Sequence, residues 1–135
     1  MFTATTQIRV RYAETDQMGF VYYGNYAQYF EVGRAESIRH LGYTYKDMEE
    51  EGVIMPVTEL QIRYLRPARY DDLITVKTTI RELPAHHKIT FHQEVYNGQD
   101  ELCCSGHVSL YFMDAKTMKR TVLPERLRAK LAESF

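Results

Sequence analysis

The spacing of hydrophobic and polar residues changes twice along the chain. Residues Thr5–Tyr12 read TTQIRVRY, with apolar side chains at alternate positions, which predicts a first β-strand. From Asn25 to about Leu41 the apolar and small residues instead recur at helical intervals, with charged residues between them. The stripe consists of Tyr26, Phe30, Gly33, Ser37 and Leu41. This segment is therefore predicted to form one long helix that ends at Gly42, followed by a short acidic helix over Tyr45–Glu51.

After Gly52 the pattern is that of strands almost to the end of the chain. The predicted strands are Val53–Tyr64 (interrupted near Pro56), Leu73–Leu83, Lys88–Tyr96 and Glu101–Asp114, with a short edge at Met118–Thr121. Residues Arg66–Asp72 form a turn, and Asn97-Gly98 indicates a hairpin. Pro124 opens a C-terminal amphipathic helix that carries Leu127 and Leu131.

This order of elements predicts an α+β fold. A single long helix cannot cover both faces of a sheet of four or five antiparallel strands, so we expect the sheet to wrap round that helix. The 135 residues suit one domain, and no repeat or linker divides them. Such a sheet leaves open edges, which edge-to-edge pairing in a homodimer or homotetramer would remove.

Composition narrows the possible partners and compartments. The formal net charge of −1 gives no general basic field for nucleic acid or an anionic bilayer. No apolar run approaches the length of a membrane span, and the N-terminus lacks the apolar core of a signal peptide, so we expect a cytoplasmic protein. The only cysteines, Cys103 and Cys104, are adjacent and predicted to be free thiols. Neither they nor His92 and His107 have the spacing of a metal site.

The candidate chemistry lies in the segment between the first strand and the long helix, where the tyrosines also cluster. Seven of the eleven tyrosines fall between Tyr12 and Tyr45. Asp16 precedes Gly19 in a loop that leads into the helix, whose first N–H groups have no intrahelical acceptor. A carboxylate beside free N–H donors suits attack on a carbonyl, because the donors can receive the oxyanion. The structural alternative is that Asp16 only caps or closes the loop.

Four stretches in order resemble the 4-hydroxybenzoyl-CoA thioesterase family of hotdog-fold acyl-CoA thioesterases, and especially its Tol–Pal-associated (YbgC-like) branch. They are Tyr12–Gly19, Val21–Tyr26, Tyr29–Glu36 and Tyr64–Asp72. The resemblance extends over nearly the whole chain. It implies a single hotdog domain over residues 1–135, subunit-interface active sites and acyl-CoA hydrolysis with no cofactor besides the coenzyme A of the substrate.

The resemblance also assigns roles by position. Asp16 matches the catalytic carboxylate, and the backbone N–H of Tyr23 matches the donor that polarises the thioester carbonyl. Glu14 occupies the first acid of the same element and is expected to be structural. Tyr12 matches a tyrosine that the Tol–Pal-associated branch places near the catalytic carboxylate, and the resemblance implies that it is a third catalytic residue. The Tol–Pal-associated branch often has histidine where this chain has Tyr23, so a side-chain proton-transfer role at this position is not carried over.

Substrate contacts are expected from the helix entrance, the sheet and two basic turns. The candidates are Tyr22, Gly24, Tyr26, Thr58, Arg66, His86, His87 and Lys88, with Arg69 as a further cation. The cations would bind the phosphates of coenzyme A, although solvated surface charge is an equally good interpretation of each. Metal ligands are not expected.

Three functions remain open at this point. The first is hydrolysis, with Asp16 as either general base or nucleophile. The second is a hotdog protein that binds acyl thioesters without cleaving them, since a fold does not fix its chemistry. The third is a dehydratase acting on acyl-carrier-protein substrates, which is less consistent with the absence of histidine from Gly19–Asn25. The acyl group is not fixed by the sequence.

Overall fold

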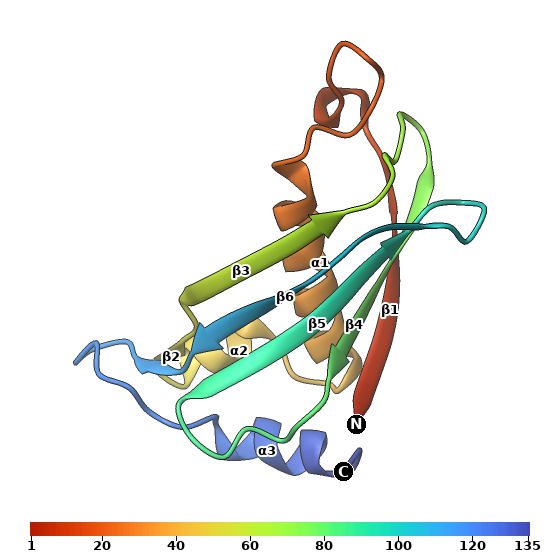
Figure 1. The fold of residues 1–135 in the computed structure, drawn as a ribbon. Coiled ribbons are helices and arrows are strands. Elements are labelled where there is room, and N and C mark those ends of the chain that lie inside the picture. Colours follow the sequence, from red (N-terminus) through yellow and green to blue (C-terminus); the bar gives the residue numbers. More distant parts are fainter.

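A curved antiparallel sheet holds one long helix on its concave side (Figure 1). The computed structural model describes all residues from Met1 to Phe135. The main sheet has the strand order β1-β4-β5-β6-β3. Its strands are β1 (Phe2–Arg9), β3 (Val57–Tyr64), β4 (Leu73–Ile80), β5 (Lys88–Tyr96) and β6 (Leu102–Tyr111). The predicted α+β class, with the sheet wrapped round the helix, is confirmed.

The long helix α1 (Asn25–His40) forms where the helical pattern predicts it. Tyr26, Phe30, Gly33 and Ser37 are buried against the sheet, and Gly42 ends the helical segment with a φ of +78°. Gly33 allows the close approach of helix and sheet, because a Cβ there would lie 2.6 Å from Cγ1 of Val76 on β4. The helix therefore lies on β1, β4 and β5.

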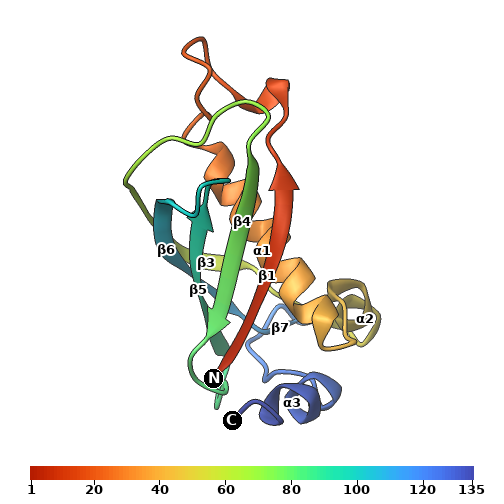
Figure 2. The same ribbon diagram turned by 90° about the vertical axis from the view of Figure 1, so that its right-hand side faces the viewer.

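Smaller elements cover one end of the sheet (Figure 2). Helices α2 (Tyr45–Glu50) and α3 (Glu125–Ala132) lie there, and α3 buries Leu127 and Leu131 as predicted. Strands β2 (Val53–Ile54) and β7 (Met113–Asp114) pair in a separate two-stranded sheet. The loop that precedes α1 lies at the opposite end. None of the helices combines the length and the apolar character needed to cross a membrane.

Several predicted strand boundaries are wrong. The first strand begins at Phe2 and ends at Arg9, whereas Tyr12 belongs to a 3₁₀ turn (η1, Tyr12–Glu14). The predicted strand Glu101–Asp114 divides into β6 and β7 around Phe112, and Met118–Thr121 contributes only an isolated bridge through Arg120.

Two local features of the predicted sheet also differ. The hairpin after β5 is longer than an Asn-Gly turn, because Asp100 adopts the positive φ of 60° and Asn97 N–H donates to the Glu101 carbonyl. A bulge opposite Val95 and Tyr96 inserts Cys103 into β6. Both cysteines are therefore buried despite being neighbours, and both are free thiols as predicted.

Strand β3 crosses β6 at very close range. Gly106 pairs with Ile62, and a Cβ on Gly106 would lie 1.9 Å from the Gln61 carbonyl oxygen. The other side of β3 is a free sheet edge, and most of its residues are exposed, including Val57, Leu60 and Tyr64. The glycine thus sets how tightly the edge strand lies on the sheet.

We predict that Gly106→Ala lowers the free energy of unfolding by at least about 2 kcal/mol, because the new methyl group must displace the backbone of β3. Urea unfolding followed by circular dichroism measures this. Gly98→Ala is the matched control, since its Cβ would meet nothing closer than 3.9 Å, and it should change stability by less than about 0.5 kcal/mol. Equal stability of the two variants would contradict the argument.

Candidate active site

The loop between β1 and α1 is closed at its base by backbone pairing. Thr15 and Val21 form an antiparallel bridge, and the Asp16 N–H donates to the Phe20 carbonyl at 2.8 Å. Next to this bridge, on the side away from the loop tip, Tyr22 N–H donates to the Glu14 carbonyl at 2.9 Å. Asp16 therefore lies inside a closed loop, and α1 begins three residues after Tyr22, where this loop closes.

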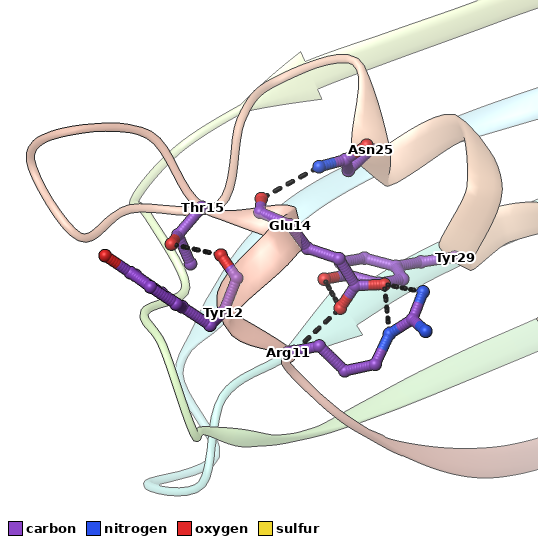
Figure 3. A network of polar contacts seen from close by, with 6 residues as sticks. All are labelled: Arg11, Tyr12, Glu14, Thr15, Asn25 and Tyr29. Carbon is purple, nitrogen blue, oxygen red and sulfur yellow. Dashed lines mark hydrogen bonds and ion pairs between the residues drawn. The ribbon is translucent and has the colours of Figure 1, made fainter.

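Glu14 joins this loop to the helix (Figure 3). Its side chain is buried, and its Oε1 accepts hydrogen bonds from Arg11 N–H at 2.8 Å and from the Tyr29 hydroxyl at 3.0 Å. The Arg11 guanidinium pairs with Oε2 at 3.3 Å. The Glu14 carbonyl also accepts from Asn25 Nδ2 at 2.8 Å. Burial, and secondarily the hydrogen bond to Glu14, raises the pKa of Tyr29, so this hydroxyl remains a donor. These contacts give Glu14 the structural position expected of it.

Asp16 combines a bound oxygen with a free one. Its Oδ1 accepts hydrogen bonds from Met18 N–H at 2.9 Å and from Phe20 N–H at 3.3 Å, while Oδ2 accepts none within the chain. Gly19, with a φ of +77°, makes this turn possible. Asp16 therefore does close the loop, through Oδ1. Its second oxygen, Oδ2, has no partner in the chain and is free to act on a substrate.

The entrance of α1 supplies unpaired donors. The N–H groups of Tyr23 and Gly24 donate to no acceptor in the chain, whereas the Tyr23 carbonyl accepts from the Tyr64 hydroxyl at 3.0 Å. The aligned peptide dipoles of α1 add partial positive charge at this end. A developing oxyanion would be stabilised at such a position.

The tyrosines expected near the site have different environments. Tyr22 and Tyr23 are exposed and contact each other, with ring centroids 4.7 Å apart. Tyr26 instead lies in the core, where its hydroxyl accepts a hydrogen bond from Ala68 N–H at 3.0 Å. Tyr12 is exposed, and its ring packs edge-on against Tyr70 at 5.6 Å, pointing away from the Glu14 carboxylate in Figure 3.

Other residues at the site were not predicted from the sequence. Tyr64 contacts the rings of Tyr23 and Tyr26 at centroid distances of 6.2 and 5.5 Å. Asn25 and Arg11 hold Glu14. The only sequence signal for Tyr64 and Asn25 is that both lie within stretches that resemble the thioesterase family. Their contacts join residues that are distant in the sequence, so residue patterns could not predict them.

The candidate cations do not meet within one chain. Arg66 and Arg69 lie in the β3–β4 connection, where Arg66 pairs with Glu101 at 2.6 Å and Arg69 stacks over the Phe20 ring at 4.9 Å. Residues His86, His87 and Lys88 lie where β5 begins, whereas the Asp16 loop lies at the end of the sheet where β1 ends and β4 begins. A nine-residue strand spans about 30 Å. Thr58 is elsewhere again, at the irregular start of β3, and donates to the Ser109 carbonyl at 3.1 Å.

The remaining histidines and the cysteines do not form a second catalytic centre. His107 pairs with Glu59 at 2.6 Å, and no three histidine, cysteine or acidic side chains cluster as metal ligands would. Burial raises the pKa of Cys103 to about 11 and that of Cys104 to about 12. Both thiols are therefore protonated near neutral pH and are poor nucleophiles.

A sheet wrapped round one long helix, with a loop carboxylate before the helix entrance, defines a hotdog-fold protein of the thioesterase type. The family model of the thioesterase-like superfamily matches residues 10–131, and the chain belongs to this superfamily. YneP of Bacillus subtilis (strain 168) is 39% identical over 119 residues, covering 88% of this chain and 86% of YneP. The acyl-CoA thioesterase YbgC of Haemophilus influenzae is 32% identical over 90% of this chain and 89% of its own. Among solved structures, the DHNA-CoA thioesterase of Staphylococcus aureus superposes with a TM-score of 0.92 at 34% identity, covering 99% of this chain and 91% of that one.

We predict that Glu14→Ala destabilises the fold by about 2–4 kcal/mol, because it leaves the buried Tyr29 hydroxyl and the Arg11 N–H without their acceptor. Thermal and urea unfolding measure the change. The control is Glu36→Ala, which removes an exposed ion pair between Glu36 and Arg39 of α1. It should lower the free energy of unfolding by less than about 0.5 kcal/mol. If both variants lose equally little stability, Glu14 does not anchor the loop.

Proposed function

We propose that the chain hydrolyses acyl-CoA thioesters at the entrance of α1. The observation that carries this proposal is that Asp16 Oδ2 and the N–H groups of Tyr23 and Gly24 all lack partners in the chain, and that Asp16 lies in the closed loop that leads directly into these N–H groups. Hydrolysis of a thioester needs both an activated oxygen nucleophile and a receptor for the oxyanion.

The proposed reaction begins with the thioester carbonyl oxygen at the Tyr23 N–H. In the base-assisted form, Asp16 removes a proton from water as the water oxygen attacks the carbonyl carbon. The resulting oxyanion is held by the N–H donors, each of which is typically worth about 3–4 kcal/mol of barrier. The intermediate then expels the coenzyme A thiolate, which takes the proton from Asp16. In the alternative form an Asp16 oxygen attacks the carbonyl carbon and the coenzyme A thiolate leaves, which forms an acyl anhydride. Water then cleaves this anhydride, frees Asp16 and the carboxylic acid, and supplies the proton that the thiolate takes up.

The side chain of Tyr23 has no proton-transfer role in this proposal. Its ring packs against Tyr22 and Tyr64, and its backbone supplies the donor. Tyr12 is assigned a position at the exposed rim of the loop, beside Tyr70. Tyr26 supports the site from the core by holding Ala68.

We infer that the complete site needs a second copy of the chain. The turn at His86, His87 and Lys88 lies at the far end of the sheet from Asp16, so these residues could bind the coenzyme A of a site only from another subunit. The open, partly apolar edge of β3 offers the surface for such pairing. Arg66, and Tyr22 and Gly24 beside the donor, are the proposed substrate contacts from the first subunit.

The names of two relatives support the proposed substrate class. The Haemophilus influenzae relative is named for acyl-CoA and the Staphylococcus aureus one for DHNA-CoA, so we propose an acyl-CoA substrate. We further propose a single domain over residues 1–135, a cytoplasmic location, and no cofactor, metal or nucleic acid in the reaction.

We predict that Asp16→Asn lowers kcat for acyl-CoA hydrolysis by roughly 100- to 10,000-fold while leaving the unfolding free energy nearly unchanged. Asparagine keeps the oxygen that accepts from Met18 and Phe20 but cannot act as base or nucleophile. Thiol release from a panel of acyl-CoA esters measures the rate. Asp100→Asn, in the turn after β5, is the control and should retain full activity. Near-normal turnover by Asp16→Asn would refute the assignment. Binding of the esters by the unaltered chain without any thiol release would favour a binding protein.

We also predict that the protein sediments as two or four chains of 15.9 kDa each. Its specific activity should fall when it is diluted below the concentration at which the assembly dissociates, because each site would draw on two subunits. Sedimentation equilibrium together with activity at graded dilution measures both. A fully active species of one chain would contradict the two-subunit site.

A further inference from the structure

Arg34, in the middle of α1, is buried without a carboxylate partner. Arg34 is only 6% exposed, its Nε is buried without a hydrogen-bond partner, and its guanidinium forms no ion pair. Arg11, Arg39, Arg66 and Arg126 are far more exposed and yet each pairs with a carboxylate. A guanidinium is always charged, and burying it unpaired costs free energy. The burial of Arg34 without an ion pair is therefore unfavourable for folding, which suggests that this charge has another role.

The surroundings of Arg34 form a groove rather than a filled core. The groove has a volume of about 180 Å³ and lies between α1 and β3. Arg34, Glu31 and Ala27 line its helix side, and Val57 and Leu60 line its strand side. The buried Tyr45 hydroxyl lies beside the Arg34 guanidinium, and neither this hydroxyl nor Arg34 Nε makes a hydrogen bond of good geometry. The guanidinium charge counteracts the rise in the pKa of Tyr45 that burial produces. A buried guanidinium without a carboxylate partner thus lines a mainly apolar groove.

The groove begins one turn after the proposed thioester position, because Ala27 of its lining lies four residues after Tyr23. Ala27, Glu31 and Arg34 follow one another at intervals of four and three residues, so they share one face of α1. Nine residues of helix separate Asn25 from Arg34 and span about 14 Å. This is roughly the length of an acyl group of about ten carbons.

We propose that Arg34 is a specificity-determining residue that selects acyl groups with an anionic oxygen at their far end, a carboxylate above all. This rests on the proposed function, because it takes the thioester carbonyl to lie at Tyr23. The apolar walls contact the middle of the acyl group, and the terminal carboxylate pairs with the guanidinium in the geometry that arginine favours. Glu31 lies one turn nearer the carbonyl and is exposed, with no ion pair to Arg34. The Glu31 carboxylate repels the terminal carboxylate of a shorter acyl group, which would end beside Glu31 instead of reaching Arg34.

The test compares acyl-CoA pairs that differ only in a terminal carboxylate: hexanoyl with adipoyl, octanoyl with suberoyl, and decanoyl with sebacoyl. We expect kcat/KM of the unaltered protein to be about tenfold or more higher for the carboxylate member of the best-fitting pair. Arg34→Met should reverse this preference, Arg34→Lys should keep part of it, and Glu31→Gln should extend it to the shorter pair. A preference that is absent, or that survives in Arg34→Met, overturns the proposal.

Stability and assembly provide the second readout. Because the charge is unpaired in the chain, Arg34→Met should unfold at the same or a higher urea concentration than the unaltered protein, and should keep the same sedimenting mass. Loss of stability or of assembly would show that a carboxylate of another subunit already pairs with Arg34, which also overturns the proposal. If the unaltered protein hydrolyses neither member of any pair, the proposed function itself has failed. If it hydrolyses both members equally, only the role of Arg34 has failed.

Discussion

The arrangement of the candidate site depends on the burial of one carboxylate. Glu14 accepts hydrogen bonds at its side chain from Arg11 and Tyr29, and at its carbonyl from Tyr22 and Asn25. Through these contacts a single residue turns the chain out of β1, closes the loop that carries Asp16, and fixes the loop to the first turn of α1. A buried carboxylate left without such donors would be strongly destabilising, so the loop has little freedom to move away from the helix.

The curved sheet provides the rest of the frame. Gly33 lets α1 lie directly on β4, and Gly106 lets β3 cross β6 at a distance that no side chain would permit. The helix is thereby held across the strands, with its N-terminal donors at one end and the groove to β3 along its side. The same curvature leaves β3 as a free edge, which is the surface that the proposed assembly would use.

Features governed by local sequence were predictable, and those governed by distant contacts were not. The bounds of α1 followed from its apolar stripe and Gly42, and those of β5 from a run of alternating residues. The first strand was misplaced because alternation continues through Val10 and Tyr12, whereas the Glu14 network turns the chain earlier. The division of β6 from β7 and the bulge at Cys103 depend on pairing with other strands.

The candidate site shows the same division. The loop and the donors at the helix entrance were predictable because the order Asp16, Gly19, helix is local in sequence. Composition could not distinguish the buried Tyr26 from the exposed Tyr22 and Tyr23, since all three lie within five residues of one another. It also could not show that Lys88 and its neighbours lie at the far end of the sheet, because this depends on the direction of β5. The burial of Arg34 could not be predicted from the sequence, because a charged residue on a helix is ordinarily solvated.

The central claim is that the backbone N–H of residue 23 receives the oxyanion of a thioester. It is tested most directly by replacing the amide between Tyr22 and Tyr23 with an ester through semisynthesis, which removes this N–H and keeps every side chain. The account predicts a fall in kcat for acyl-CoA hydrolysis of roughly 100-fold or more, with little change in KM or in the thermal unfolding midpoint. An unchanged kcat in a correctly folded ester variant would contradict it.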